Sequence, residues 1–229
     1  METTLHRQLK ALYATAGATQ EARVAAFRVD VARPDTLVEI QTAPLAAIRD
    51  KVAALADDHP LLVVKPIAHR RYIVRLDRKP PRGGPHAAWL TDPPSRRLSP
   101  KRGSLLDVFL ELVHFTRAFI HERLTMEVLL TEEEEWRLSA RRSRRRVHRY
   151  TVIDRRLVRV LSHHRLDRPA DLCSLLPPGL PQPFDTQELA AHLNRPRWFA
   201  QAVAYCLRET GAARVVEKRR NSLVYTLGQ

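Results

Sequence analysis

The sequence predicts a mixed α/β (α+β) protein, in which a mixed sheet is flanked by helices and a smaller helical unit follows at the C-terminal end. Over the first 76 residues, segments with leucine at helical spacing alternate with segments rich in β-branched residues. The run Leu61–Val64 is continuously apolar and follows a predicted helix, which indicates a crossover onto a buried central strand. Helix caps and turn residues recur after residue 169, so we expect a second unit there.

The N-terminal part is expected to run helix, strand, strand, helix, strand, strand. Its first helix is predicted because Leu5, Leu9 and Leu12 share one helical face. The segment Ala32–Thr36 contains Pro34 and is predicted to be the turn between the first two strands. The expected elements are a helix at 2–14, strands at about 22–32 and 36–42, a helix at 46–55, and strands at 61–64 and 72–76.

The middle of the chain is expected to be less regular. Residues 78–103 are rich in Pro, Gly and Arg, which predicts a long basic loop. A helix at about 104–121 and a strand at 124–130 follow, and the run Glu132–Glu135 is interpreted as a solvated edge. The expected regions are a domain at 1–140, a basic connecting segment at 141–168 and a C-terminal domain at 169–229.

The C-terminal part has the element order of a winged helix. Asp185 and Glu188 form a capping box that opens a short helix, and a second helix is predicted at 197–209. A first helix at about 171–176 and a hairpin at 213–227 complete the order. In a winged helix that binds DNA, Arg197 would lie on the reading helix, and the hairpin tip with Arg219 and Arg220 would form the wing. A protein-docking module is the alternative interpretation.

The positive charge is concentrated in the second part of the chain. The formal net charge is +14, of which +11 belongs to residues 141–229. Such a surface attracts polyanions, and nucleic acid, most simply DNA, is the expected partner. The alternative is a solubilising excess of arginine. The densest cluster is expected to grip a phosphate backbone, and it consists of Arg141, Arg142, Arg144, Arg145 and Arg146.

Composition excludes several other classes. No uninterrupted apolar stretch is long enough to cross a membrane, and the polar start of the chain does not have the pattern of a signal peptide, so a cytoplasmic protein is expected. Cys173 and Cys206 lie in apolar, helix-like settings and are interpreted as core residues. A protein partner or a homodimer remains open.

Two acids near the N-terminus are the strongest chemical signal. Asp30 lies in a predicted strand, and Glu39 lies in the next strand together with Gln41. Side chains alternate along a strand, so Glu39 and Gln41 share one face. Ionised carboxylates within a sheet are costly unless they are paired, hydrogen-bonded or coordinated, so this pair suggests a shared cation. The alternative is that the two acids are structural and pair with Arg28 or Arg49.

This pattern resembles the PD-(D/E)xK nuclease superfamily, including the Glu-x-Gln variants found in competence-type nucleases. The resemblance covers about residues 1–76 and implies a restriction-endonuclease-like sheet. It implies that Asp30 and Glu39 hold Mg²⁺ (or Mn²⁺) with the carbonyl oxygen of Ile40, and that the ion activates water for phosphodiester hydrolysis. Many members add an acid from the first helix, for which Glu2, stacked with His6 and Lys10, is the candidate; Glu21 is the alternative.

The chain also resembles a set of uncharacterised bacterial proteins that share its segments 39–42 and 99–103, a likeness that implies no activity.

Gln41 departs from the superfamily pattern, because that position usually holds a lysine. A glutamine can position water but adds no positive charge, so Lys51 on the predicted crossover helix, or Lys65 on the central strand, is expected to stabilise the phosphate. The alternative function is that of a non-catalytic DNA-binding regulator, or an accessory subunit, with a degenerate nuclease core.

Overall fold

A seven-stranded sheet forms the larger part of the molecule, and a three-stranded sheet belongs to a second unit at the C-terminal end. The computed structural model describes residues 2–76, 95–139 and 150–228. The strand order of the large sheet is β1-β2-β3-β4-β6-β7, and β5 pairs with β4 outside this path. Its strands are β1 (Thr19–Val24), β2 (Phe27–Ala32), β3 (Leu37–Ile40), β4 (Leu61–Leu76), β5 (Arg96–Leu98), β6 (Leu124–Ser139) and β7 (Tyr150–Leu166). The predicted mixed α/β class is confirmed.

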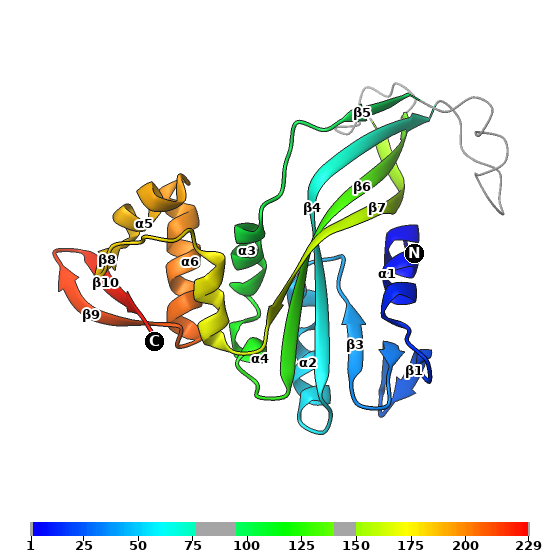
Figure 1. Cartoon of the computed structure of the whole chain (residues 1–229), viewed down its shortest axis with the longest axis horizontal. Coiled ribbons are helices and arrows are strands. Elements are labelled where there is room, and N and C mark those ends of the chain that lie inside the picture. The colour runs from blue at the N-terminus through cyan, green and yellow to red at the C-terminus, as the bar shows by residue number, and fades with distance from the viewer. Residues whose placement is uncertain (1, 77–94, 140–149, 229) are drawn as a thin grey trace, which may run out of the picture.

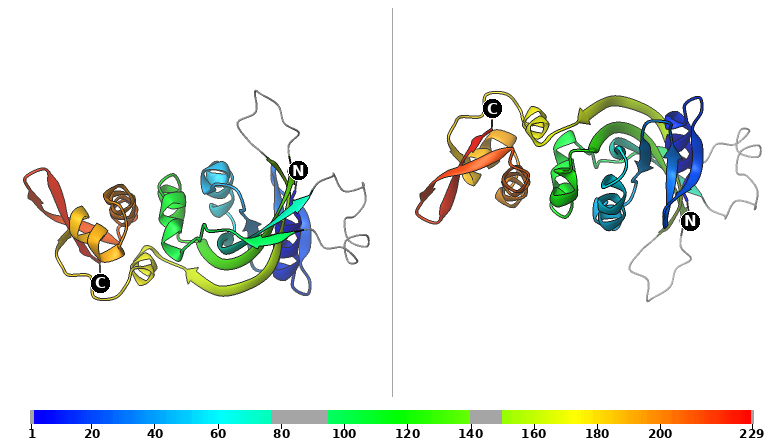
Figure 2. Two further views of the ribbon diagram at one scale, coloured as in Figure 1. Left: turned by 90° about the horizontal axis from the view of Figure 1, so that it is seen from above. Right: turned by 90° about the horizontal axis from the view of Figure 1, so that it is seen from below.

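Helices cover both faces of the N-terminal strands. The strands β1, β2 and β3 form an antiparallel meander, and β4 returns parallel to β3 after the short η1 (Leu45–Ile48) and the helix α2 (Arg49–Ala56). The helix α1 (Thr4–Tyr13) buries Leu5 and Leu9 against Val38 and Ile40, whereas Leu12, expected on the same face, is 59% exposed. Leu37 and Val63 face the opposite layer, which contains α2. Figure 2 shows the curved sheet from above, with α2 on its inner side.

The single strand expected at 22–32 is a hairpin. The chain turns at Ala25, whose φ of 50° lies in the left-handed region. Alanine adopts that conformation rarely, and no glycine or asparagine marks the turn, so the sequence did not reveal it.

The strands β4, β6 and β7 form a long curved ribbon that extends past the other strands (Figure 1). The strands expected at 61–64 and 72–76 are one strand of 16 residues, and the strand expected at 124–130 continues to Ser139. Residues 150–166, expected within a connecting segment, form β7, which pairs with β6 along its length. The basic residues in the middle of β4 resembled a loop, but they lie opposite acids of β6.

The acidic run on β6 is therefore not a solvated edge. Glu132, Glu133 and Glu135 are each 3% exposed, because β6 lies between β4 and β7. Glu132 pairs with Arg70 of β4 at 3.1 Å and with Arg159 of β7 at 2.9 Å. Buried carboxylates are tolerated when they are paired and hydrogen-bonded, so the arginines of both neighbouring strands keep the acids in the sheet.

The helix expected at 104–121 is broken into three parts, η2 (Leu105–Asp107), α3 (Val108–Leu112) and α4 (Thr116–Phe119). The break occurs at Phe115, where φ is −131° and ψ is 0°. Phe109, Phe115 and Phe119 are all buried, and the break allows all of them to face the core.

The C-terminal unit has the element order expected for a winged helix. Its elements are η3 (Pro169–Leu175), β8 (Phe184–Asp185), α5 (Thr186–Leu193), α6 (Arg197–Glu209), β9 (Ala213–Arg219) and β10 (Ser222–Leu227), with the strand order β8-β10-β9. The capping box forms as predicted, because Asp185 accepts from the amides of Gln187 and Glu188, and Glu188 accepts from the amide of Asp185. The first helical segment, η3, is a 3₁₀ helix rather than an α-helix.

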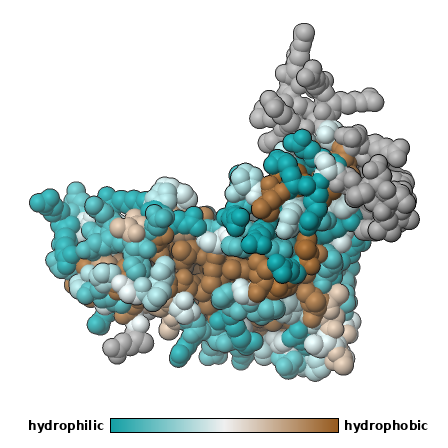
Figure 3. Space-filling model, turned by 45° about the horizontal axis from the view of Figure 1, so that its top comes forward, coloured by the Kyte–Doolittle hydropathy of each residue, from teal (hydrophilic) through white to brown (hydrophobic). Residues whose placement is uncertain are grey.

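The two units share one hydrophobic core. Phe109 and Leu112 of α3 belong to the same buried cluster as Val203 and Leu207 of α6. The Cys206 thiol lies 3.3 Å from the carbonyl oxygen of Phe109, so it is a core residue as expected. Figure 3 shows hydrophobic residues gathered between the C-terminal unit and the large sheet. In the part of the chain that the structure describes, no helix has the length and apolar character needed to cross a membrane.

We expect Phe109→Ala to lower the free energy of unfolding by about 3–5 kcal/mol, the usual cost of emptying a buried phenylalanine site. The neighbouring Leu110 is 39% exposed, so Leu110→Ala is the matched control and should cost less than about 1 kcal/mol. Chemical denaturation should show a single transition for both units, because they share this core. Separate transitions in the wild-type protein would contradict the shared core.

Candidate active site

The two predicted acids, Asp30 on β2 and Glu39 on β3, lie where these strands separate. Backbone pairing between these strands is limited to Val31 with Val38 and Ala32 with Leu37. One residue further, the Asp30 carboxylate accepts the backbone N–H of Ile40 at 2.8 Å. Asp30 therefore takes the place of a backbone acceptor on β2 and holds the end of β3. Its second contact comes from His6 of α1, whereas Glu39 on β3 is contacted by Lys51 of α2.

The environment of Asp30 favours its ionised form. Its side chain is 13% exposed, and its other oxygen lies 2.9 Å from Nε2 of His6 on α1. Burial alone would raise the pKa of this carboxyl. The hydrogen bonds from His6 and the Ile40 amide, with the charges of His6 and Lys10, outweigh burial and hold the pKa below its usual range.

The pKa of Glu39 is shifted in the opposite direction to that of Asp30. Burial, reinforced by the negative charge of Asp30, raises the pKa of its carboxyl, although Lys51 opposes the shift. Oε1 of Glu39 lies 2.6 Å from the Lys51 ammonium. Oε2 is buried and has no hydrogen-bond partner among the described residues. Carboxylate oxygens are the donor type that Mg²⁺ prefers, and Oε2 of Glu39 is the one of the four oxygens that no described residue contacts, so it is the atom that fits a hard cation.

Of the two candidate lysines, Lys51 contacts Glu39, and Lys65 contacts neither Glu39 nor Asp30. Besides Glu39, the Lys51 ammonium contacts the carbonyl oxygen of Arg28 at 2.5 Å. The Lys65 ammonium lies 3.2 Å from Glu111 and 2.7 Å from the carbonyl oxygen of Ala43. Burial lowers the pKa of Lys65, and the negative charge of Glu111 opposes that shift.

The side chain of Gln41 points toward the segment that follows β3. Its side-chain amide donates to the carbonyl oxygen of Pro44 at 2.7 Å, and its backbone amide donates to Val64 at 2.9 Å. The side chain therefore shapes the exit from β3.

Glu2, which precedes α1, and Glu21 of β1 lie around Lys10. Glu2 and Glu21 both pair with its ammonium, which is buried. Glu2 also lies 4.0 Å from His6. The structure thus connects the stacked Glu2, His6 and Lys10 with Asp30 through His6. Across residues 2–76, 95–139 and 150–228, no three His, Cys, Asp or Glu side chains are grouped to hold a metal ion.

The arginines named as alternative partners contact other acids. Arg28 pairs with Glu21 at 2.5 Å, and Arg49 pairs with Asp50 at 3.0 Å. The pairing of Asp30 and Glu39 with His6 and Lys51 distinguishes this site from an arginine-neutralised structural pair.

The predicted nucleic-acid contacts are only partly described. The Arg141–Arg146 cluster lies outside the described residues. On α6, Arg197 approaches the hydroxyl groups of Thr186 and Ser222 at 3.5 and 3.3 Å, and Arg219 pairs with Glu217 at 3.4 Å. Arg220 forms the exposed hairpin tip, with a φ of 53°. Because α6 packs against α3, only a narrow stripe of this helix, including Trp198, remains exposed.

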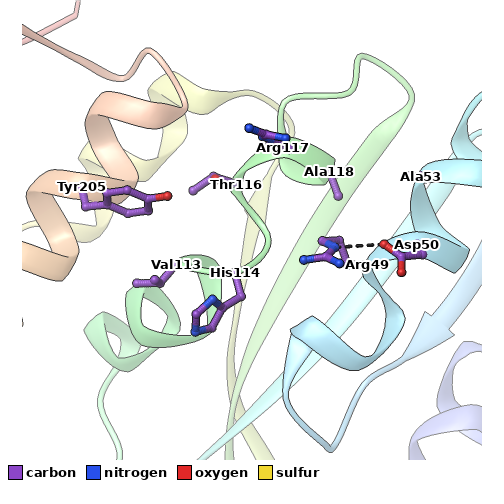
Figure 4. Close-up of a pocket in the computed structure, with 9 residues that line it drawn as sticks. All are labelled: Arg49, Asp50, Ala53, Val113, His114, Thr116, Arg117, Ala118 and Tyr205. Carbon is purple, nitrogen blue, oxygen red and sulfur yellow. Dashed lines mark hydrogen bonds and ion pairs between the residues drawn. The ribbon is translucent and has the colours of Figure 1, made fainter.

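A second hollow, which the sequence did not indicate, lies between α2, α4 and α6 (Figure 4). The Tyr205 hydroxyl points toward α4, and Arg49 bonds to Asp50 on the opposite wall. Its residues come from three distant segments and have no shared sequence pattern. Asp50 is its only carboxylate among the described lining residues, so it lacks the acid pair of the β2–β3 site.

Comparisons with known proteins identify a family that matches most of this chain. A family model described as "Domain of unknown function (DUF8091)" matches residues 3–167. A protein of Treponema pallidum (strain Nichols), described as an uncharacterized protein, is 30% identical over 190 residues, which are 82% of this chain and 71% of that protein. No solved structure matches.

The opposite pKa shifts predict opposite effects of neutralising each acid. A carboxyl whose pKa is lowered in the folded state stabilises the fold above its ordinary pKa, and this contribution is lost as the pH falls through the folded pKa. We therefore expect Asp30→Asn to lower the free energy of unfolding at pH 7 by roughly 1–3 kcal/mol, the usual value for hydrogen bonds to a charged group.

For Glu39 the effect on stability is reversed. Because its pKa is raised in the folded state, the ionised Glu39 carboxylate destabilises the fold at pH values above that pKa. Glu39→Gln should leave the melting temperature at pH 8 equal to or above that of the wild-type protein, and the difference should shrink toward pH 4. Thermal melts of both variants across this range measure the effects. A large loss of stability in Glu39→Gln at pH 8 would contradict the assignment.

Proposed function

This chain belongs to the DUF8091 family, and we propose that it is a Mg²⁺-dependent nuclease that hydrolyses phosphodiester bonds in DNA. The observation that carries the proposal is the buried Glu39 oxygen without a partner among the described residues, on the strand whose next residue, Ile40, donates its backbone N–H to the Asp30 carboxylate. The negative charge of Asp30 acts on the Glu39 carboxyl, which supports a site that both acids share.

The topology around the acids supports the proposal. A helix, an antiparallel meander of three strands, a crossover helix and a fourth strand parallel to the third is the arrangement implied by the resemblance to PD-(D/E)xK nucleases. The two acids lie on the second and third strands of this unit, as the resemblance implies. The family match itself names no activity, so the support comes from geometry.

Each residue has a distinct task in this proposal. Asp30 and Glu39 would hold the ion, which supplies a polarised water and charge stabilisation for the phosphate. His6 keeps Asp30 ionised and oriented through its 2.9 Å contact. The Lys51 ammonium, already beside Glu39, supplies the positive charge that Gln41 lacks. The strongly basic surface attracts the DNA substrate.

One specific observation favours a second candidate function, that of a non-catalytic DNA-binding protein. His6 and Lys51 already pair with the two acids, and Glu2 and Glu21 are paired with Lys10 instead of completing a third metal ligand. A nuclease core that had lost its activity could keep such internal pairing while the basic surface still bound DNA.

Cleavage assays on the full chain test the proposal. With Mg²⁺ or Mn²⁺ and a panel of single-stranded and duplex DNA, Asp30→Asn and Glu39→Gln should each reduce the cleavage rate by on the order of 10²–10³-fold, because each removes a group that holds the ion. Lys51→Ala should reduce the rate by about 10²-fold. The affinity for DNA measured in EDTA should be nearly unchanged.

The matched control is Asp35→Asn, which neutralises an exposed acid in the nearby turn and should cleave like the wild-type protein. Wild-type protein that binds DNA but cleaves nothing with either metal would favour the second candidate. Cleavage by both acid variants at the control's rate would refute the assignment of the site.

A further inference from the structure

A basic groove lies on the distal part of the ribbon that β4, β6 and β7 form. Neither Asp30 nor Glu39 is among its described lining residues. Its volume is about 610 Å³, and it lies between β4, β6, β7 and the segment that follows β5. Six of the described lining residues are basic, against a single acid, Glu135. The basic residues are Arg71, Arg97, Lys101, Arg102, Arg137 and Arg155.

One wall of the groove is fixed by backbone contacts. The amide of Ser99 donates to Arg71 at 2.7 Å, and the amide of Gly103 donates to Ala68 at 3.0 Å, so residues 99–103 are held against β4 at both ends. A Cβ atom at Gly103 would lie 2.7 Å from the carbonyl oxygen of Ala68. Only glycine allows this approach, so the position of Lys101 and Arg102 over the groove depends on it.

The opposite wall is a set of arginines arranged around one buried carboxylate. Glu135 lies 2.6 Å from Arg137, 3.2 Å from Arg155 and 3.5 Å from Arg71. Burial would raise the pKa of Glu135, but the hydrogen bond from Arg137 and the charges of the three arginines keep it below its usual range. One negative charge therefore orders three guanidinium groups and leaves an excess of positive charge.

The three other basic residues of the groove form no ion pair with an acid among the described residues. Arg97, Lys101 and Arg102 are exposed, and none of them has an acidic partner there. The groove lining consequently has a net charge of +5 at neutral pH. Clustered cations repel one another, so this excess of positive charge suits an anion with several negative groups.

Apolar and aromatic side chains lie among these cations. Ile67, Ile73 and Val152 line the groove with Tyr150, and the guanidinium carbon of Arg137 lies 3.9 Å from the centroid of the Tyr150 ring. Basic grooves with an aromatic side chain are typical of sites for single-stranded nucleic acid, in which cations follow the phosphates and bases stack on rings. An acidic peptide would use the cations but not the aromatic ring.

We propose that this basic groove binds a single strand of nucleic acid through successive phosphates. The site extends the proposed function, because it assigns the form of the substrate. It does not use Asp30 or Glu39, so binding is measured in EDTA, where the proposed cleavage cannot occur. The probe is a fluorescein-labelled oligothymidylate, and the readout is fluorescence anisotropy at several salt concentrations.

A triple variant with Arg97→Ala, Lys101→Ala and Arg102→Ala should weaken binding by at least tenfold. The slope of log affinity against log salt should become shallower by about 2, since each phosphate contact on a single strand contributes roughly 0.7. The charge-matched control carries Arg23→Ala, Arg117→Ala and Arg214→Ala, three exposed arginines outside the groove, and should weaken binding by less than about threefold.

Gly103→Ala tests the wall without changing any charge. It should weaken binding while the protein keeps a cooperative thermal transition, because the added methyl group moves residues 99–103 away from β4. Equal losses in the triple variant and its control would overturn the proposal, as would wild-type protein that fails to bind the oligonucleotide at low salt. Stronger competition by duplex DNA, by thymidine monophosphate or by polyglutamate than by unlabelled oligothymidylate would also overturn it.

Discussion

The parallel pairing of β4 with β6 along their whole length is the constraint on which the rest of the structure depends. At its beginning, β4 also pairs with β3, and this contact fixes the strand that carries Glu39. At its far end, β4 holds β5 and the segment after it, and so it fixes the wall of the basic groove. One strand of 16 residues therefore positions both the candidate active site and the groove.

The pairing is stabilised by charge as much as by burial. Apolar residues such as Val63 and Met126 fill the first half of the ribbon, where helices cover it. Further along, the strands exchange apolar for ionic contacts between Glu132 to Glu135 and arginines of β4 and β7. Buried acids would be costly alone, but guanidinium groups on both sides compensate for their lost hydration. The ribbon thus extends beyond the part that helices cover, and a small buried cluster of Val74, Leu76 and Trp136 packs at its far end.

The sequence predicted the secondary structure correctly where local signals and tertiary packing agree. The capping box at Asp185, the buried Leu5 and Leu9 of α1, and the crossover helix before the buried strand β4 formed as the patterns indicate. It failed where long-range pairing decides the structure, because the acids of β6 and the arginines of β4 each resemble solvated segments when they are read alone. The contacts of His6 and Lys51 with the two acids likewise depend on helices from both faces of the sheet, so spacing alone favoured Lys51 but left Lys65 as a second option.

The shared core between α3 and α6 also bears on how the chain divides. The family model ends at residue 167, yet Phe109 and Leu112 are buried in the same cluster as Val203 and Leu207. A chain ended at that boundary would present this part of α3 to water, and exposed apolar surfaces of that kind promote self-association. We therefore expect the segment that the family model matches to need the C-terminal helices to cover this part of α3.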